Sequence, residues 1–268
     1  MKTVLLAAVS GVALSMAATG AMAGPFTDVN QFLSAAQTAL DTINIAGHDG
    51  GATTQTAINA GNLIDLSEVN YAGLGLVWQT DFAPQFANNY ADSFFGSFDK
   101  LTQEATNVAN SINGVNNVVA IDQLAVGPQI ASNEIGYGSF FGFGSDLLNA
   151  TQTATNVSNI ASLDTLDSFS TQTSHSWQTA ANVTTYFGAP SFFAPGADKV
   201  DQEATNATNL LTITGHLPTA YFSPLPELSQ TATGAQLATN TLTVPDLSGK
   251  VTQAATNVAN SITNVTGD

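Results

Sequence analysis

The sequence of 268 residues contains no cysteine, and only 9% of its residues are charged. Without cysteine, neither a disulfide nor thiol chemistry can contribute to the protein. Four basic residues, all lysine, stand against 20 acidic residues, which gives a formal net charge of −16. Nucleic acids and anionic membrane surfaces are bound by clustered lysine and arginine, so we expect neither as a partner. The polar surface must therefore come from Asn, Gln, Ser and Thr.

Residues that carry out catalysis or hold metal ions are also scarce. His48, His175 and His216 lie far apart in the sequence and do not form the close pairs typical of zinc ligands. The chain has no Gly-x-Ser-x-Gly motif for a nucleophilic serine and no calcium-binding loop. The carboxylates show no placement that singles out two for glycoside chemistry. We therefore predict neither an enzyme nor a cofactor.

The N-terminus has the pattern of a secretory signal peptide at residues 1–23. Lys2 is followed by an apolar run at residues 4–18 and by Ala21-Met22-Ala23, a small-x-small cleavage site. The alternative is a membrane anchor, but the run is shorter than the roughly 20 apolar residues that cross a bilayer. We predict a secreted protein, located outside the cell or on its surface, without membrane insertion.

One ten-residue phrase recurs five times. It begins at residues 55, 103, 152, 202 and 253, with spacings of 48, 49, 50 and 51, and its shared pattern is Gln-x-Ala-x-Asn-x-x-Asn. Such even self-similarity predicts about five stacked units of about 50 residues. The residues that define the phrase are Gln55, Asn59, Asn62, Gln103, Asn107, Asn110, Gln152, Asn156, Asn159, Gln202, Asn206, Asn209, Gln253, Asn257 and Asn260.

Other features follow the same period. Weaker copies near the midpoints begin at Gln85, Gln129, Gln178 and Gln230 and indicate a half-unit, a coil of about 25 residues. Pairs of phenylalanine at 94–95, 140–141 and 192–193 precede strong copies, and we expect them to pack between coils. A lysine lies three residues before three of the strong copies, and we expect it to neutralise nearby acids; these lysines are Lys100, Lys199 and Lys250, and the acids Asp99, Asp198 and Asp201.

The phrase can be interpreted as a helix or as a strand. In a helix, Ala105, Val108 and Ile112 share one face, but Thr and Asn are poor helix formers. In a strand, Gln103, Ala105 and Asn107 share one face, and these are the positions that define the phrase. The period of two favours the strand, and the helix remains the alternative.

Stacking explains the choice of residues. Amide side chains carry both donors and acceptors, so at one height in successive rungs about 4.8 Å apart they can bond to one another in ladders. A charge in such a row would meet its own copy one rung away. The sequence therefore predicts a mostly β, repetitive β-solenoid-like repeat domain at residues 47–268.

The segment at residues 24–46 differs from the repeats. Its apolar residues follow helical spacing, with Thr27 or Asp28 as a cap, and they are Val29, Phe32, Leu33, Ala36, Leu40 and Ile43. We predict a short amphipathic helix that covers the first coil, as solenoid ends require. A docking or export segment is the alternative.

The repeated phrase resembles the curlin family of bacterial functional amyloids, whose repeats are built on Gln, Asn, Gly and Ala. The matching run is Gln103-x-Ala105-x-Asn107, then Asn110, with the equivalent residues in the other copies. The 50-residue unit is also similar to the subunits of Pseudomonas-type amyloid fibres. The resemblance implies secreted subunits that stack as β-solenoids into extracellular biofilm fibres, with outer-membrane export or nucleation proteins as partners.

Three functions follow from these observations. The leading hypothesis is a structural subunit that polymerises with itself by templated strand addition, through the amide rows. The second is a monomeric solenoid adhesin that binds glycans or proteins. The third is a polysaccharide-cleaving enzyme on a parallel β-helix, which the lack of arginine disfavours.

Overall fold

The protein is mostly β, as the sequence predicts. The computed structural model describes residues 27–45, 49–65, 74–93, 98–138, 147–187, 197–215, 227–244 and 247–264, and these consist of strands and short turns. No helix occurs in these ranges, so none that could span a membrane is found there. The predicted signal peptide lies outside the described residues.

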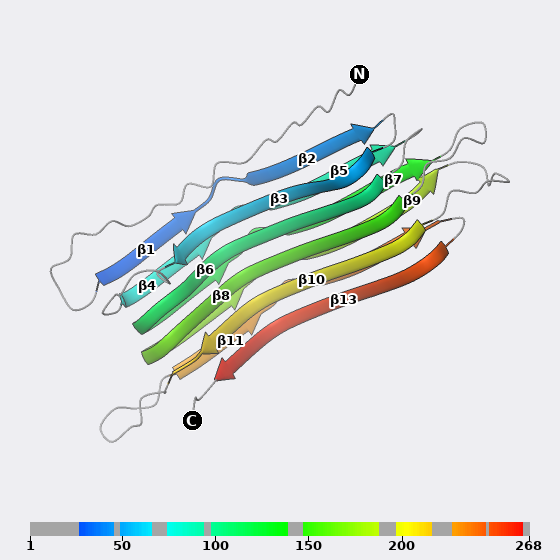
Figure 1. The fold of residues 1–268 in the computed structure, drawn as a ribbon. Helices are drawn as coiled ribbons and strands as arrows, with labels where there is room; N and C mark the ends of the chain where they lie inside the picture. Colours follow the sequence, from blue (N-terminus) through cyan, green and yellow to red (C-terminus); the bar gives the residue numbers. More distant parts are fainter. Residues whose placement is uncertain are drawn as a thin grey trace.

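The strands form two sheets in which all neighbours are parallel (Figure 1). The central path of the larger sheet runs through β1 (Thr27–Leu33), β4 (Leu74–Asp81), β6 (Phe98–Ala125), β8 (Leu147–Ser174), β10 (Ala197–Ile213) and β13 (Leu247–Asn264). In addition, β3 (Asp49–Asp65) pairs with β6, and β11 (Glu227–Ala232) pairs with β8. The smaller sheet contains β2 (Gln37–Ile45), β5 (Gln85–Ser93), β7 (Gln129–Gly138), β9 (Gln178–Phe187) and β12 (Gln236–Thr243).

Each coil has two layers. The first half of β6 pairs with β3 and its second half with β4, so the long strands β6 and β8 belong to both layers. We call β3, β10, β13 and the first halves of β6 and β8 the front layer. The back layer consists of the second halves, β1, β4, β11 and the smaller sheet. Hydrogen bonds across the layers join residue 62 to 80, 59 to 86 and 55 to 90, which shows that the chain reverses direction between them.

The register places each strong copy of the phrase on the next strong copy. Gln55 lies on Gln103, Gln103 on Gln152, Gln152 on Gln202 and Gln202 on Gln253. The weaker copies at Gln85, Gln129 and Gln178 lie instead in the smaller sheet and stack on one another. The stacking unit is therefore the 50-residue unit, and the expectation of 25-residue coils was wrong.

Inward and outward residues alternate along the strands, as in β5, where every second residue is buried. Alanines occupy the middle of the interior, where small side chains let the two layers approach closely. Larger apolar residues fill both ends of the cross-section, with Ile112 and Leu211 in one cluster and Phe98 and Tyr137 in the other. The interior is thus apolar at its two ends, and amides and alanines lie between them.

The two strands of the back layer meet at a corner that stacks in every coil. Backbone bonds continue from one corner to the next, such as Gln85 N to Pro128 O and Gln129 N to Trp177 O. The corners approach so closely that a Cβ on Gly127 would lie 2.1 Å from the carbonyl oxygen of Ala83. Glycine is required there because any side chain would collide with backbone.

The expected N-terminal helix was wrong. Residues 27–33 and 37–45 form β1 and β2. Phe32 and Leu40, which helical spacing assigned to the covered face, are exposed by 64% and 46%. The inward row is Gln37, Ala39 and Asp41, which repeats the Gln-x-Ala-x-Asn pattern with Asp in place of Asn. Pairing with β5 thus overrides the helical spacing of the apolar residues.

Candidate assembly surface

The five strong-copy glutamines form one hydrogen-bonded row in the front layer. Each Gln donates from Nε2 to Oε1 of the Gln in the preceding coil, over 2.6–2.8 Å. Within the stack these side chains are buried; Gln103 and Gln152 have no exposed surface. The members of the row are Gln55, Gln103, Gln152, Gln202 and Gln253.

The ten asparagines of the phrase form two further rows with the opposite polarity. Each Asn donates from Nδ2 to Oδ1 of the Asn in the following coil. The first row runs through Asn59, Asn107, Asn156, Asn206 and Asn257 with distances of 2.9 Å. The second runs through Asn62, Asn110, Asn159, Asn209 and Asn260 with distances of 2.7–2.9 Å. The structure thus brings together all 15 residues that the repeat singled out.

The back layer contains three rows that the sequence analysis did not define. One glutamine row joins Gln31, Gln79, Gln123, Gln172 and Gln230 at 2.7 Å. Another joins Gln37, Gln85, Gln129, Gln178 and Gln236 at 2.8–2.9 Å. A third joins Asn89, Asn133, Asn182 and Asn240 at 2.8–2.9 Å, and Asp41 occupies its first position. The weaker copies of the Gln-x-Ala-x-Asn pattern are the sequence signal for these rows, but loops of unequal length make their spacing uneven.

Most amides in the interior also bond to the facing layer. Asn107 donates to the carbonyl oxygen of Ile130 at 2.8 Å, Asn110 to that of Leu124 at 2.9 Å, and Gln103 to that of Glu134 at 3.1 Å. One amide hydrogen therefore serves the row and the other joins the layers. Buried polar groups are stable only when their bonds are made, and this arrangement makes most of them.

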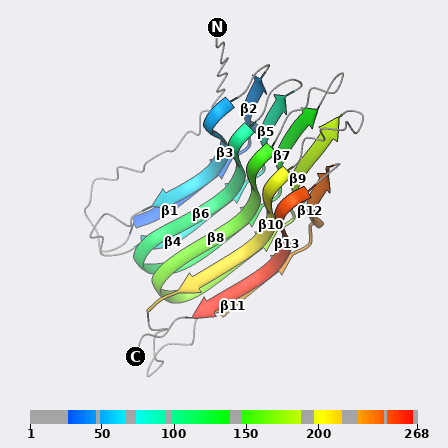
Figure 2. The ribbon, with the colours of Figure 1, turned by 45° about the vertical axis from the view of Figure 1, so that its right-hand side comes forward.

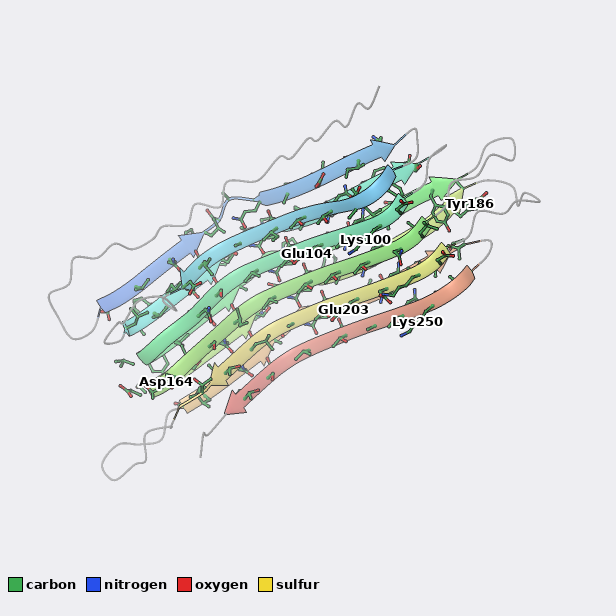
Figure 3. The ribbon with its side chains drawn as sticks, in the orientation of Figure 1. Lys100, Glu104, Asp164, Tyr186, Glu203 and Lys250 are labelled. Carbon is green, nitrogen blue, oxygen red and sulfur yellow. The ribbon has the colours of Figure 1, made fainter. Side chains whose placement is uncertain are left out.

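Charged side chains of the repeat lie outside the rows. Glu104 and Glu203 are exposed and are labelled on the front layer in Figure 3. Lys199 forms an ion pair with Asp201, with 2.6 Å between Nζ and Oδ2, which confirms the expected neutralisation at this lysine. The hydrogen bond from Lys199 lowers the pKa of Asp201.

Asp81 is an exception, because its carboxyl group is buried at the corner of the second coil. Oδ1 accepts from the backbone N of Ala83 at 2.6 Å and Oδ2 from Nε2 of Gln85 at 3.3 Å. A Cβ on Gly61 would lie 2.5 Å from Oδ2, so glycine at 61 makes the space for the carboxyl group. Desolvation by burial raises the pKa of Asp81 to about 7.

The two ends of the stack consist of different layers. Among the described strands, β3 packs between β2 and β5 of the smaller sheet, and the other front-layer strands up to β10 are likewise flanked by two. By contrast, β13 packs against only β12 of that sheet, and β2 packs against only one front-layer strand, β3. The described chain therefore begins with an uncovered back-layer half-coil and ends with an uncovered front-layer half-coil. Figure 2 shows the smaller sheet stacked from β2 to β12 beside the long strands.

The strands at both ends leave one edge open. The first end consists of β1, β2 and β3, and each of them pairs with one strand of the described chain. The same holds for β11, β12 and β13 at the last end. The inward residues Gln253 and Asn257 are exposed on β13, although their equivalents in inner coils are buried. Open parallel edges present unpaired N–H and C=O groups to an incoming strand.

The remaining candidates from the sequence do not form a site. The phenylalanine pairs at 94–95, 140–141 and 192–193, with His48 and His216, lie outside the described residues. His175 lies at a corner, where its ring contacts the hydroxyl of Thr233. Within the described ranges, no three His, Asp or Glu side chains are grouped so that they could hold a metal ion.

Comparisons with protein-family models, with curated proteins and with solved structures found no match to this chain.

Proposed function

We propose that the protein is a secreted structural subunit that assembles with copies of itself into extracellular fibres of a bacterial biofilm or cell surface. Its principal partner would be a second copy of the same chain, with outer-membrane export or nucleation proteins acting before assembly. The support comes from the two ends of the stack, from the polarity of the amide rows and from the distribution of charge.

The complementary half-coils carry the proposal. Two strands of the smaller sheet, β9 and β12, flank β10, one on each side. Only β12 flanks β13, so the inner face of β13 is uncovered on its other side. In a second molecule, β2 has the matching deficit, because it lacks a front-layer strand on one side. Placing the first end of one molecule on the last end of another would fill both positions and continue the parallel pairing of both sheets.

The amide rows distinguish the two ends chemically. At the first end, the Nε2 groups of Gln31 and Gln37 lie on the open side, because their Oε1 atoms accept from the next coil, and Asn59 and Asn62 direct Oδ1 acceptors outward. At the last end the glutamines direct Oε1, and Asn257 and Asn260 direct Nδ2. If each row continues into the same row of the next molecule, donors meet acceptors only when unlike ends join. Equal rows opposed at two like ends would place donor against donor and acceptor against acceptor. A head-to-tail polymer follows from this polarity.

The distribution of charge supports the same arrangement. Like charges one rung apart destabilise stacked strands, and the five strong-copy glutamines and their asparagines are uncharged. The net charge of −16 is carried mostly by acids outside these rows. Such a charge keeps dissolved chains apart without disrupting the junction itself.

The test is to follow the purified chain, without residues 1–23, at neutral pH. We expect fibres that bind thioflavin and show meridional diffraction near 4.8 Å, the spacing of stacked strands. Growth should proceed from preformed fibre ends after seeding. A chain that stays monomeric in the presence of seeds would contradict the proposal.

A monomeric adhesin is the second candidate, because one group of apolar side chains is exposed at the first end. Phe32, Trp78 and Phe82 are exposed by 64%, 46% and 43%, and the rings of Phe32 and Phe82 lie 5.8 Å apart. Exposed aromatic rings of this kind can stack on sugars or dock a protein. Binding of monomer to a glycan panel, lost in Trp78→Ala, would favour this function.

A further inference from the structure

All lysines of the repeat domain lie on one face of the stack. Beyond residue 23 the chain has three, and two of them are labelled on the front layer in Figure 3. The register places the three in one column along the stack, in which Lys100 aligns with Asn149, Asn149 with Lys199, and Lys199 with Lys250. All three lysines are exposed. The scarce positive charge of the protein is therefore concentrated on the outer surface of the front layer.

A column of glutamates runs beside the lysines on the same surface. Glu104 follows Lys100 by four residues, and Glu203 follows Lys199 by four. Residues an even number apart point to the same side of a strand, and four residues span about 13 Å. Thr153 lies between the two glutamates in the register, so they are two coils apart. In β6 and again in β10, a lysine and a glutamate thus share one height of the stack.

This pattern of charge is complementary to itself. A two-fold axis parallel to the stack reverses the strand direction in a second copy but keeps every coil at its height. With this axis over Thr102, midway between the columns, Lys100 of one copy would face Glu104 of the other. Lys199 would face Glu203 in the same way. In a two-fold interface the same surface serves both copies, so each of these contacts occurs twice.

The front layer also has the size and the side chains of an interface. Its five strands lie about 4.8 Å apart, and about ten residues of about 3.3 Å each give a face of about 800 Å². One partner of a standard interface buries about the same area. Short β-branched side chains allow a second sheet to approach closely, as in dry contacts between stacked sheets. Four of the five residues between the charged columns are threonine, and the column is Thr54, Thr102, Thr151, Asp201 and Thr252.

We propose that a second copy of this chain covers the front layer, so that a fibre contains two filaments of the same direction that are paired face to face. Their filaments rest on the proposed head-to-tail assembly, whereas the pairing of faces also applies to two dissolved molecules. Asp201 lies over the axis and would face its own copy. Lys199 of the same chain offsets this repulsion, because its Nζ lies 2.6 Å from Oδ2 of Asp201.

Two charge variants test the pairing. In the first, Lys100→Glu with Lys199→Glu places glutamates in both columns; in the second, Glu104→Lys with Glu203→Lys places lysines in both. Neither variant is complementary to itself, but each is complementary to the other. Filaments of the two are grown separately, then mixed, and electron microscopy counts the filaments across each fibre. We expect paired filaments to be at least about fivefold rarer in each variant alone and to return in the mixture.

The matched control is Glu134→Lys with Glu227→Lys. It changes the net charge as much as the second variant does, but both of its glutamates are exposed on the back layer. A smaller net charge by itself favours association, so the control should pair at least as well as the unaltered chain. Equal pairing of the second variant and the control would overturn the proposal. Single filaments of the unaltered chain, or a mixture that pairs no better than its components, would overturn it as well.

A measurement on dissolved chains separates this proposal from that of the fibre. We expect sedimentation velocity to show a dimer in the mixture of the two variants, with an apparent Kd at least about tenfold below that of either variant alone. If no chain forms filaments, the fibre proposal fails, and this dimer still decides the pairing of the faces. If filaments form and remain single, with no dimer in the mixture, the pairing alone fails.

Discussion

Asp81 makes the stability of the folded chain depend on pH. Its pKa of about 7 lies above the usual 3.8 because burial disfavours the charged form. Between these values the folded chain keeps a proton that the unfolded chain releases, so its contribution to stability falls as pH rises from about 4 to about 7. Below about pH 4 the carboxyl group is protonated in the folded and the unfolded chain, so folding does not bury a charge. Above about pH 7 it is ionised in both, and the folded chain bears the full cost of burying the charge.

We therefore expect Asp81→Asn to flatten the pH dependence of stability. At about pH 8 the free energy of unfolding should rise by up to about 4 kcal/mol, and near pH 4 it should change little. Urea unfolding at a series of pH values measures this. Glu104→Gln removes an exposed charge as the control, and an equal slope in both variants would contradict the assignment to Asp81.

Gln152 shows what one amide contributes to the middle of a row. Its Nε2 donates to Gln103 and to the carbonyl oxygen of Val183, and its Oε1 accepts from Gln202 and Thr184. Gln152→Ala leaves these buried partners unpaired, and we expect a loss of about 3 kcal/mol or more in the free energy of unfolding. Thr153→Ala, on the adjacent outward position, should change it by less than about 1 kcal/mol. If chemical denaturation shows similar losses in the free energy of unfolding for Gln152→Ala and Thr153→Ala, the row is not what stabilises the stack.

At the scale of the strand, the sequence predicts the front layer well and the back layer poorly. The strong copies are evenly spaced, so the period of two along Gln103, Ala105 and Asn107 predicts the inward face. The back-layer row through Gln31, Gln79, Gln123 and Gln172 has spacings of 48, 44 and 49, because loops of different length intervene. Loop length is not fixed by strand register, and rows separated by such loops lose their visible period.

The first two strands match a helical pattern in the sequence for a physical reason. Apolar residues at 29, 33, 36, 40 and 43 match a helix as closely as two strands broken at a corner. The decisive features are Gln31 and Gln37, whose amides each continue a row begun in other coils. A single sequence does not show that Asp41 replaces an asparagine until the register with Asn89 is known.

The end strand β13 can be altered without disturbing its bonds within the chain. Asn257 and Asn260 accept from Asn206 and Asn209 through Oδ1, and aspartate at either position can still accept. We expect Asn257→Asp with Asn260→Asp to leave the unfolding midpoint within a few degrees of that of the unaltered chain. Seeded elongation should slow by at least about tenfold, because the junction loses two donors and gains two charges.

The matched variant carries the same changes one coil inward, at Asn206 and Asn209. Those residues donate within the chain, so their replacement should lower the unfolding midpoint itself. If the inner and outer variants affected folding and elongation alike, the open edge of β13 would not be the growing surface.

The whole molecule is a one-dimensional stack in which each coil touches only its neighbours. The stability of such proteins is close to a sum of unit and interface contributions. Residues 147 and 197 occupy equivalent positions in register, so removal of residues 147–196 deletes one complete coil. We expect this shortened chain to fold, to keep every amide row and to form fibres, with a rise per subunit that is smaller by about 4.8 Å.

Electron microscopy of the shortened fibres measures that rise. A shorter deletion of about half a coil, residues 147–171, removes a front-layer strand but keeps the back-layer strand β9. It breaks the alternation of the two layers and the register of the rows, and it should prevent folding. Folding of both deletions to the same extent would contradict a stack held in register by its amides.

The continuity of the rows through the junction is tested most directly by cysteine cross-linking, because the chain has no cysteine of its own. If the rows continue, Thr252 of one molecule lies in register with Thr54 of the next, about 4.8 Å away and within the range of a disulfide. Oxidised fibres of Thr54→Cys with Thr252→Cys should therefore yield a series of covalent multimers under denaturing conditions. Thr54→Cys with Thr256→Cys, offset by four residues or about 13 Å, should yield none. Absence of multimers in the first pair, or equal amounts in both pairs, would contradict the head-to-tail continuation of the rows.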